Sequence, residues 1–389
     1  MQKRQKPLLF LMLLASLLPL FSFSTAATTV NPLSVSAKSA VLIEAESAEI
    51  VYAKNANTML PMASTTKIMT ALTALKLAKL SDKICVDARA VGVEGSSIYL
   101  VEGEILTLEE LLYALLLESA NDAAVAIAIG VSGSVDAFCD EMNRMAKELG
   151  LVQTHFTNPH GLDDEEHYTT AYELALIARS LLKNEALKKI VSTQKTTVSH
   201  DGTAHARLMV NHNKLLRTYE GCIGIKTGFT KRSGRCLVSA AKRNGVCLIA
   251  VTLNAPDDWR DHTALFDCGF SQYRSVLLCT SGEYQIMLPV VGGTGGECVI
   301  TNPNELRITL PNRPVTVTSS IELPRFVYAP VTTDEVIGKA VFFADLDGDG
   351  IKEKIAETQL SATQTIDQPP REKSWLDRLI DFFKNLFSF

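Results

Sequence analysis

The alternation of apolar and polar positions predicts a mixed fold of strands and helices over the first two thirds of the chain. Two β-rich runs at 40–43 and 49–52 flank a polar turn, which predicts a hairpin. From residue 68 the apolar positions follow helical spacing, which indicates a buried helix. Further helical patterns begin with a Thr107–Glu110 capping box and occupy 107–117, 123–129, 135–149, 170–182 and 261–273.

A second hairpin is predicted near the middle of the chain. The runs 236–241 and 246–253 alternate and are rich in β-branched residues, and Asn244-Gly245 between them is a strong turn signal. We therefore expect the preceding stretch, 224–230, to form a strand beside this hairpin.

The pattern changes at about residue 275. Short β-like runs at 276–279, 285–289, 306–310, 315–321 and 338–343 are separated by glycine, proline and asparagine, and they predict a small all-β domain up to residue 368. Within it, 345–350 resembles the opening of a calcium loop, but the twelfth position is Ala356 instead of a bidentate glutamate. We predict a tight acidic turn between two strands there.

Both ends of the chain carry patterns typical of exported, membrane-associated proteins. Residues 1–26 combine a basic start, an apolar run and a small-residue cleavage point after Ala26, which predicts a signal peptide; an uncleaved anchor helix is the alternative. Residues 369–389 form a linker and an amphipathic helix of roughly 22 Å, too short to cross a bilayer. This helix suits the membrane interface, and docking on the protein or a dimer contact is the alternative.

Composition narrows the classes of function. The formal charge of −5 over 389 residues, without a sustained basic run, argues against a nucleic-acid partner. The eight cysteines contain no Cys-x-x-Cys pair, so zinc ligation has no support, and neither a metal nor another cofactor is expected. Export would permit disulfides, so the cysteines are either buried thiols or form one or two bridges.

Candidate chemistry lies in three polar stretches. Ser64 and Lys67 are three residues apart at a predicted helix start, so they share one helical face. A desolvated lysine can take the proton of such a serine and make it a nucleophile. The second stretch, 119–121, holds a serine and an asparagine in a polar break between two apolar helices, and the third, 226–228, lies on the predicted strand.

In order and spacing, Ser-x-x-Lys, Ser-x-Asn and Lys-Thr-Gly resemble the signature of penicillin-binding proteins and serine β-lactamases. The chain most closely resembles the serine-type D-Ala-D-Ala carboxypeptidases. That resemblance implies an α/β (α+β) catalytic domain at 27–274, with an antiparallel sheet flanked by helices and a helical subdomain, before the β-rich domain at 275–368. It rests on longer stretches at 61–67, 118–122, 158–162, 167–171 and 224–228.

The resemblance also implies a substrate, a peptidoglycan stem peptide ending in D-Ala-D-Ala, and β-lactams as inhibitors. Ser64 would attack the penultimate carbonyl while Lys67 accepts its proton. Ser119 would pass a proton to the leaving amine, and Asn121 would hold the peptide and Lys67.

The third motif would bind the substrate. By the same resemblance, Lys226 and Thr227 face the terminal carboxylate, Gly228 lets the peptide lie along the strand, and the backbone N–H of Phe229 joins that of Ser64 in an oxyanion hole. Arg260 would assist with the carboxylate.

The roles of two histidines and the exact reaction stay open. His212 stands where some relatives have an arginine, which puts the carboxylate contact in doubt. His160 has a structural or a catalytic role. A class A β-lactamase would need a Glu-x-x-Leu-Asn stretch that is not found, whereas an endopeptidase, or a β-lactam sensor that acylates without turnover, would use the same motifs.

Overall fold

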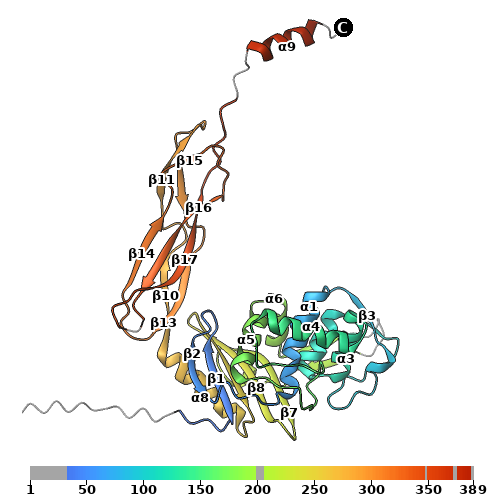
Figure 1. The fold of residues 1–389 in the computed structure, drawn as a ribbon. Coiled ribbons are helices and arrows are strands. Elements are labelled where there is room, and N and C mark those ends of the chain that lie inside the picture. The colour runs from blue at the N-terminus through green and yellow to red at the C-terminus, as the bar shows by residue number, and fades with distance from the viewer. Residues whose placement is uncertain (1–32, 199–205, 347, 371–374, 387–389) are drawn as a thin grey trace, which may run out of the picture. The chain divides into compact units, whose positions relative to one another are not determined.

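The computed structural model describes residues 33–198, 206–346, 348–370 and 375–386 (Figure 1). The predicted signal peptide at 1–26 lies outside these residues, and the predicted domain boundaries stay predictions.

A five-stranded antiparallel sheet forms the centre of the first part of the chain (Figure 1). The strand order is β2-β1-β9-β8-β7, so the first strands pair with the last ones. Both predicted hairpins are present, and the strand at the edge carries the Lys-Thr-Gly motif, as predicted. The strands are β1 (Ser39–Glu44), β2 (Ile50–Lys54), β7 (Cys222–Thr230), β8 (Gly234–Arg243) and β9 (Val246–Leu253).

Helices cover both faces of this sheet and bury its inner strands β1, β8 and β9. Val41 and Ile43 of β1 belong to the same core as residues of α5 (Ala171–Leu182). The intervening residue, Leu42, points the other way. A Cβ at Gly269 of α8 (Asp258–Gln272) would lie 2.8 Å from Leu42, so α8 approaches closely on that face.

A group of buried helices belongs to the same hydrophobic core as Val41 and Ile43. The predicted Thr107–Glu110 capping box is present, but the predicted helix at 107–117 is α-helical only to Tyr113 and then widens into a π-helical turn. The elements are α1 (Lys67–Leu77), α2 (Leu108–Tyr113), η3 (Ala114–Glu118), α3 (Asn121–Ser132) and α4 (Val135–Glu148).

Several short elements were not expected from the sequence pattern. They include the helix α6 and a hairpin, β5–β6, that precedes the third motif. These elements are β3 (Lys83–Cys85), η2 (Ala88–Ala90), β4 (Ile105–Thr107), α6 (Glu185–Ser192), β5 (Lys195–Val198), β6 (Arg207–Val210) and α7 (Leu215–Thr218).

From Tyr273 to Ala362 the described elements are strands, with a separate core that includes Leu288, Ile300 and Phe342. A six-stranded sheet has the order β14-β16-β17-β12-β11-β15, and β10 pairs with β13. The sequence pattern missed β12, β15 and β17. The strands are β10 (Tyr273–Cys279), β11 (Ile286–Val291), β12 (Glu297–Thr301), β13 (Leu306–Pro311), β14 (Val317–Glu322), β15 (Val327–Tyr328), β16 (Val336–Ala344) and β17 (Glu353–Ala362).

The acidic stretch between β16 and β17 is a turn, as predicted, because the Asp345 carboxylate accepts hydrogen bonds from the backbone N–H groups of Gly348 and Gly350. All eight cysteines lie in the described ranges, and each is a free thiol.

The predicted terminal helix is present as α9 (Trp375–Leu386), and Trp375, Leu376, Leu379 and Ile380 expose apolar side chains. Across the described ranges, no single helix has the length and apolar character to span a membrane; one pair, α3 and α4, meets both criteria jointly, with a bend of 86°.

Candidate active site

A cavity of about 360 Å³ brings the three motifs together. Ser64 and Ser119 reach it from the helical side, and Thr227, Gly228 and Phe229 reach it from β7. Lys67, Asn121 and Lys226 are buried next to these residues. The cavity is lined by Ser64, Ser96, Ser119, His212, Thr227, Gly228, Phe229, Arg235, Asp258 and Trp259.

Ser64 lies in a 3₁₀ turn, η1 (Ala63–Thr66), that leads directly into α1. Two threonine side chains stabilise the turn: Thr65 Oγ1 donates to the Met62 carbonyl at 2.6 Å, and Thr66 Oγ1 donates to the Ala63 carbonyl at 2.8 Å. These local bonds keep the serine fixed at the wall of the cavity while α1 places Lys67 one turn further on.

The Lys67 amine is fully buried and contacts three oxygen atoms. Its Nζ lies 3.0 Å from Ser64 Oγ, 2.7 Å from Asn121 Oδ1 and 2.6 Å from the His160 carbonyl oxygen. Burial holds the pKa of Lys67 well below its usual range, and the nearby Lys226 lowers it further. A neutral amine donates only twice. With both hydrogens on the amide and carbonyl oxygens, its lone pair is left for the Ser64 hydroxyl.

The second motif lies at a break between two helices, as the sequence predicted. Ser119 follows the π-helical turn with a φ of 62°, and α3 begins at Asn121. The side-chain amide of Asn121 donates to the Glu94 carbonyl at 2.5 Å, and its backbone N–H donates to the Ser96 carbonyl at 2.7 Å. The loop before the motif therefore orients the amide oxygen that contacts Lys67.

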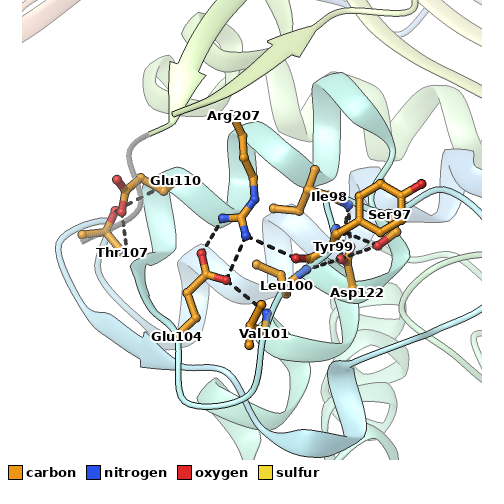
Figure 2. A network of polar contacts seen from close by, with 10 residues as sticks. All are labelled: Ser97, Ile98, Tyr99, Leu100, Val101, Glu104, Thr107, Glu110, Asp122 and Arg207. Carbon is orange, nitrogen blue, oxygen red and sulfur yellow. Dashed lines mark hydrogen bonds and ion pairs between the residues drawn. The ribbon is translucent and has the colours of Figure 1, made fainter. Parts of the chain in front are cut away.

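A network of polar contacts fixes this loop (Figure 2). The buried carboxylate of Asp122 accepts hydrogen bonds from Ser97 Oγ at 2.6 Å and from the backbone N–H groups of Ile98 and Leu100. At the other end of the loop, Arg207 of β6 forms an ion pair with Glu104. The loop that contacts Asn121 is thus tied to α3 and to β6.

The third motif brings the edge strand against the nucleophile. A Cβ at Gly228 would lie 3.0 Å from the Ser64 backbone nitrogen and 3.2 Å from the Met62 carbonyl oxygen, so a larger residue would push the strand away. Lys226 is 1% exposed and donates to the Thr227 carbonyl at 2.9 Å. Burial lowers the pKa of Lys226 to about 7.

Three histidines surround the site and are held neutral by burial. His160 accepts the Leu162 N–H at Nδ1, and burial lowers its pKa to about 3. His167 was not predicted as a site residue, and its Nε2 lies 2.7 Å from Thr66 Oγ1; burial lowers its pKa to about 4. His212 lines the cavity 3.4 Å from Glu118, and burial lowers its pKa.

The arginine at the cavity is not the one that the sequence suggested. Arg260 is exposed and does not line the cavity, whereas Arg235 of β8 does. Ser96, Asp258 and Trp259 also line it and were not predicted as site residues. The pairing of β7 with β8 could have pointed to Arg235, because this residue lies directly opposite Phe229.

Known proteins match this chain over the region that forms the site. The family described as D-alanyl-D-alanine carboxypeptidase matches residues 26–257. D-alanyl-D-alanine carboxypeptidase DacF of Bacillus subtilis is 40% identical over 247 residues, 61% of this chain and 63% of the relative. The match thus covers less than two thirds of that relative's length.

Solved structures are similar over a larger share of the chain. Penicillin binding protein 5 from Haemophilus influenzae is 27% identical, with a TM-score of 0.64 over 87% of this chain and 100% of that chain. A peptidoglycan synthesis regulatory factor from Streptococcus pneumoniae is 25% identical, with a TM-score of 0.71 over 86% of this chain and 100% of that one. These similarities confirm the predicted fold class.

Proposed function

Because this chain belongs to the D-alanyl-D-alanine carboxypeptidase family, we propose that it is an exported serine enzyme that removes the terminal D-alanine from peptidoglycan stem peptides. The observation that carries this proposal is the buried Lys67 amine 3.0 Å from Ser64 Oγ, at the wall of a cavity shared by all three motifs. A neutral, fixed amine beside a serine hydroxyl suits nucleophilic catalysis on a carbonyl carbon.

In the first half-reaction, Ser64 Oγ attacks the carbonyl carbon of the penultimate D-alanine, and the Ser64 proton passes to Lys67. The negative oxygen of the tetrahedral intermediate is stabilised by the backbone N–H groups of Ser64 and Phe229; losing one such donor costs about 3 kcal/mol. A proton relayed through Ser119 reaches the leaving nitrogen, the C–N bond breaks, and D-alanine departs. The shortened peptide remains as an ester on Ser64.

In the second half-reaction, water attacks this ester. Lys67 takes a proton from the water, the bond to Ser64 Oγ breaks, and the serine recovers its proton. The shortened peptide leaves with a free carboxylate. Asn121 holds the Lys67 amine through both steps, because its Oδ1 is 2.7 Å from Nζ.

The edge strand β7 supports substrate binding beside the nucleophile. Its outer side has no partner strand in the five-stranded sheet of the described residues, so an extended peptide can lie against it. Gly228 permits the close approach, and Lys226 and Thr227 attract the carboxylate end. β-Lactams would acylate Ser64 by the same route.

The enzyme would act at the outer face of the cytoplasmic membrane. The pattern at 1–26 supports export, and the exposed apolar residues of α9 support attachment at the membrane interface. Deleting residues 375–389 should release the protein from neutral lipid vesicles in a sedimentation assay. Equal vesicle binding without those residues would refute the attachment.

The test of the function is D-alanine release from a diacetyl-Lys-D-Ala-D-Ala peptide by the wild type and by Ser64→Ala. The wild type should release D-alanine, and the variant should not. Labelled penicillin, run in parallel, separates a β-lactam sensor, which would label at Ser64 without releasing D-alanine. Release that survives Ser64→Ala would refute the mechanism.

A further inference from the structure

A substrate with a free carboxylate needs a positively charged side chain in the cavity. The basic side chains there differ in pKa, and so in the pH range over which they stay charged. Burial lowers the pKa of Lys226 to about 7, and it lowers the pKa values of Lys67 and His212 as well. A guanidinium stays charged at every pH where an enzyme works. Of the described side chains that line the cavity, Arg235 alone therefore carries a permanent positive charge.

The Arg235 guanidinium is held in place by α8. The Asp258 Oδ1 atom accepts a hydrogen bond from Arg235 Nε at 3.0 Å and forms an ion pair with Nη2 at 2.9 Å, and the backbone N–H of Trp259 donates to the same oxygen at 3.0 Å. The Asp258 side chain is only 3% exposed, so this contact is shielded from water. The Trp259 ring centre lies 5.7 Å from the guanidinium carbon.

The guanidinium still has an edge for a ligand. The Arg235 side chain is 43% exposed at the cavity wall, and within the described ranges its Nη1 makes no hydrogen bond. The N–H groups of Nη1 and the second N–H of Nη2 form the fork that fits a carboxylate. Because Asp258 and Trp259 already fix the side chain, binding would cost little conformational entropy.

Strand register places this fork on the same face of the sheet as Thr227 of the third motif. Arg235 pairs with Phe229, and Leu237 pairs with Thr227, in the antiparallel ladder of β7 and β8. Directly opposite residues share a face of the sheet, and so do residues two apart on one strand. Arg235, Phe229 and Thr227 therefore lie on one face, next to the start of α8.

We propose that Arg235, fixed by Asp258 and Trp259, forms a bidentate ion pair with the terminal carboxylate of the substrate, in place of Arg260. The inference rests on the proposed function, since it concerns the same cavity and the same peptide. It makes Arg235 the residue that selects peptides with a free C-terminal carboxylate. Arg260 points elsewhere because residues i and i+2 of a helix do not face the same side, and Asp258 already faces the cavity.

The test compares two peptides, diacetyl-Lys-D-Ala-D-Ala and its C-terminal amide, on the full chain. The measured quantity is the ratio of kcat/KM for the acid to kcat/KM for the amide. Arg235→Gln should lower this ratio roughly 10- to 100-fold, because hydrogen bonds to a charged group are lost. Arg260→Gln, and the matched surface control Arg232→Gln, should keep the wild-type ratio.

The outcomes separate this inference from the proposed function. If the wild type releases no D-alanine, the function itself is wrong. If the wild type is active but Arg235→Gln keeps its ratio, or Arg260→Gln loses it, only the assignment to Arg235 is wrong. Arg235→Lys serves as a second variant in case Arg235→Gln does not fold, because it keeps the positive charge but lacks the guanidinium fork. Its ratio should fall between those of the wild type and Arg235→Gln. An unchanged ratio would refute the bidentate contact.

Discussion

At the scale of single residues, the site depends on lysines that are kept away from water. Lys67 and Lys226 are both buried, and burial lowers the pKa of each amine; the nearby Lys226 lowers the pKa of Lys67 further. A charged Lys67 has no lone pair to offer Ser64. A neutral Lys226 attracts no carboxylate, so the two lysines need opposite charge states.

This requirement predicts a bell-shaped pH profile for kcat/KM on the free-acid peptide. The acidic limb reflects protonation of Lys67, and the alkaline limb reflects loss of the Lys226 proton, whose pKa in the free enzyme is about 7. With the C-terminal amide as substrate, the alkaline limb should weaken, because no carboxylate needs the Lys226 charge. An identical alkaline limb for both peptides would exclude Lys226 as its origin.

The sequence allowed the contact between Ser64 and Lys67 to be predicted, but not the arginine at the cavity. Ser64 and Lys67 are three residues apart, so local helical geometry alone brings them together. Arg235 reaches the cavity because β8 pairs with β7 and α8 begins at Asp258. Those are tertiary contacts that no local pattern shows, whereas Arg260, two residues after Asp258 on α8, is exposed and does not line the cavity.

At the scale of elements, the loop before α3 is held by charges that the sequence did not single out. Glu104 has a side chain that is 1% exposed, and it pairs with Arg207, which is 103 residues away in sequence (Figure 2). The sequence predicted the flanking helices from their apolar spacing. It could not predict this pair, because nothing local connects the two residues.

Arg207→Gln should destabilise the protein by about 3 kcal/mol, since it removes the ion pair that the buried Glu104 carboxylate forms with Arg207. It should also slow acylation, because the loop that orients Asn121 is loosened. The double variant Arg207→Gln/Glu104→Gln should recover much of the stability, since the buried negative charge is removed as well. Chemical denaturation of the two single variants and the double variant measures the coupling; purely additive losses would show that the pair does not act as a unit.

At the scale of the whole molecule, buried neutral histidines make the stability of the folded state depend on pH. His262 of α8 is fully buried, with its Nε2 3.0 Å from Thr252 Oγ1, and burial lowers its pKa to about 3. In the unfolded chain a histidine binds a proton below about pH 6.5. Because the unfolded state then binds more protons than the folded state, stability is full above pH 6.5 and is lost as the pH falls towards 3.

His262→Phe should remove this contribution. Between pH 7 and pH 5 the wild type should lose about 2 kcal/mol of unfolding free energy through His262 alone, and the variant should lose correspondingly less. The comparison uses the change with pH, so any loss of the Thr252 contact at pH 7 does not affect it. Parallel stability curves for the two proteins would show that His262 does not titrate on unfolding.

Most of the architecture could be predicted from the sequence, and there are physical reasons why some elements were missed. Asn244-Gly245 fixed the hairpin beside the third motif, and the change of pattern at residue 275 indicated the β-rich region. β17 was missed because polar residues such as Glu353 and Glu357 dominate its exposed positions, and β12 and β15 were missed because they are short, with five and two residues. The π-helical turn before Ser119 was missed because its apolar spacing resembles that of an α-helix.

The central claim is that Lys67 activates Ser64 as the nucleophile. The most direct test is the second-order rate of penicillin acylation at pH 7.5, followed by intact mass, for the wild type and Lys67→Gln. Glutamine keeps hydrogen-bonding capacity next to Asn121 but cannot accept the serine proton, so acylation should slow by roughly 100-fold or more, with the adduct still on Ser64. A Lys67→Gln variant that acylates at the wild-type rate would contradict the account.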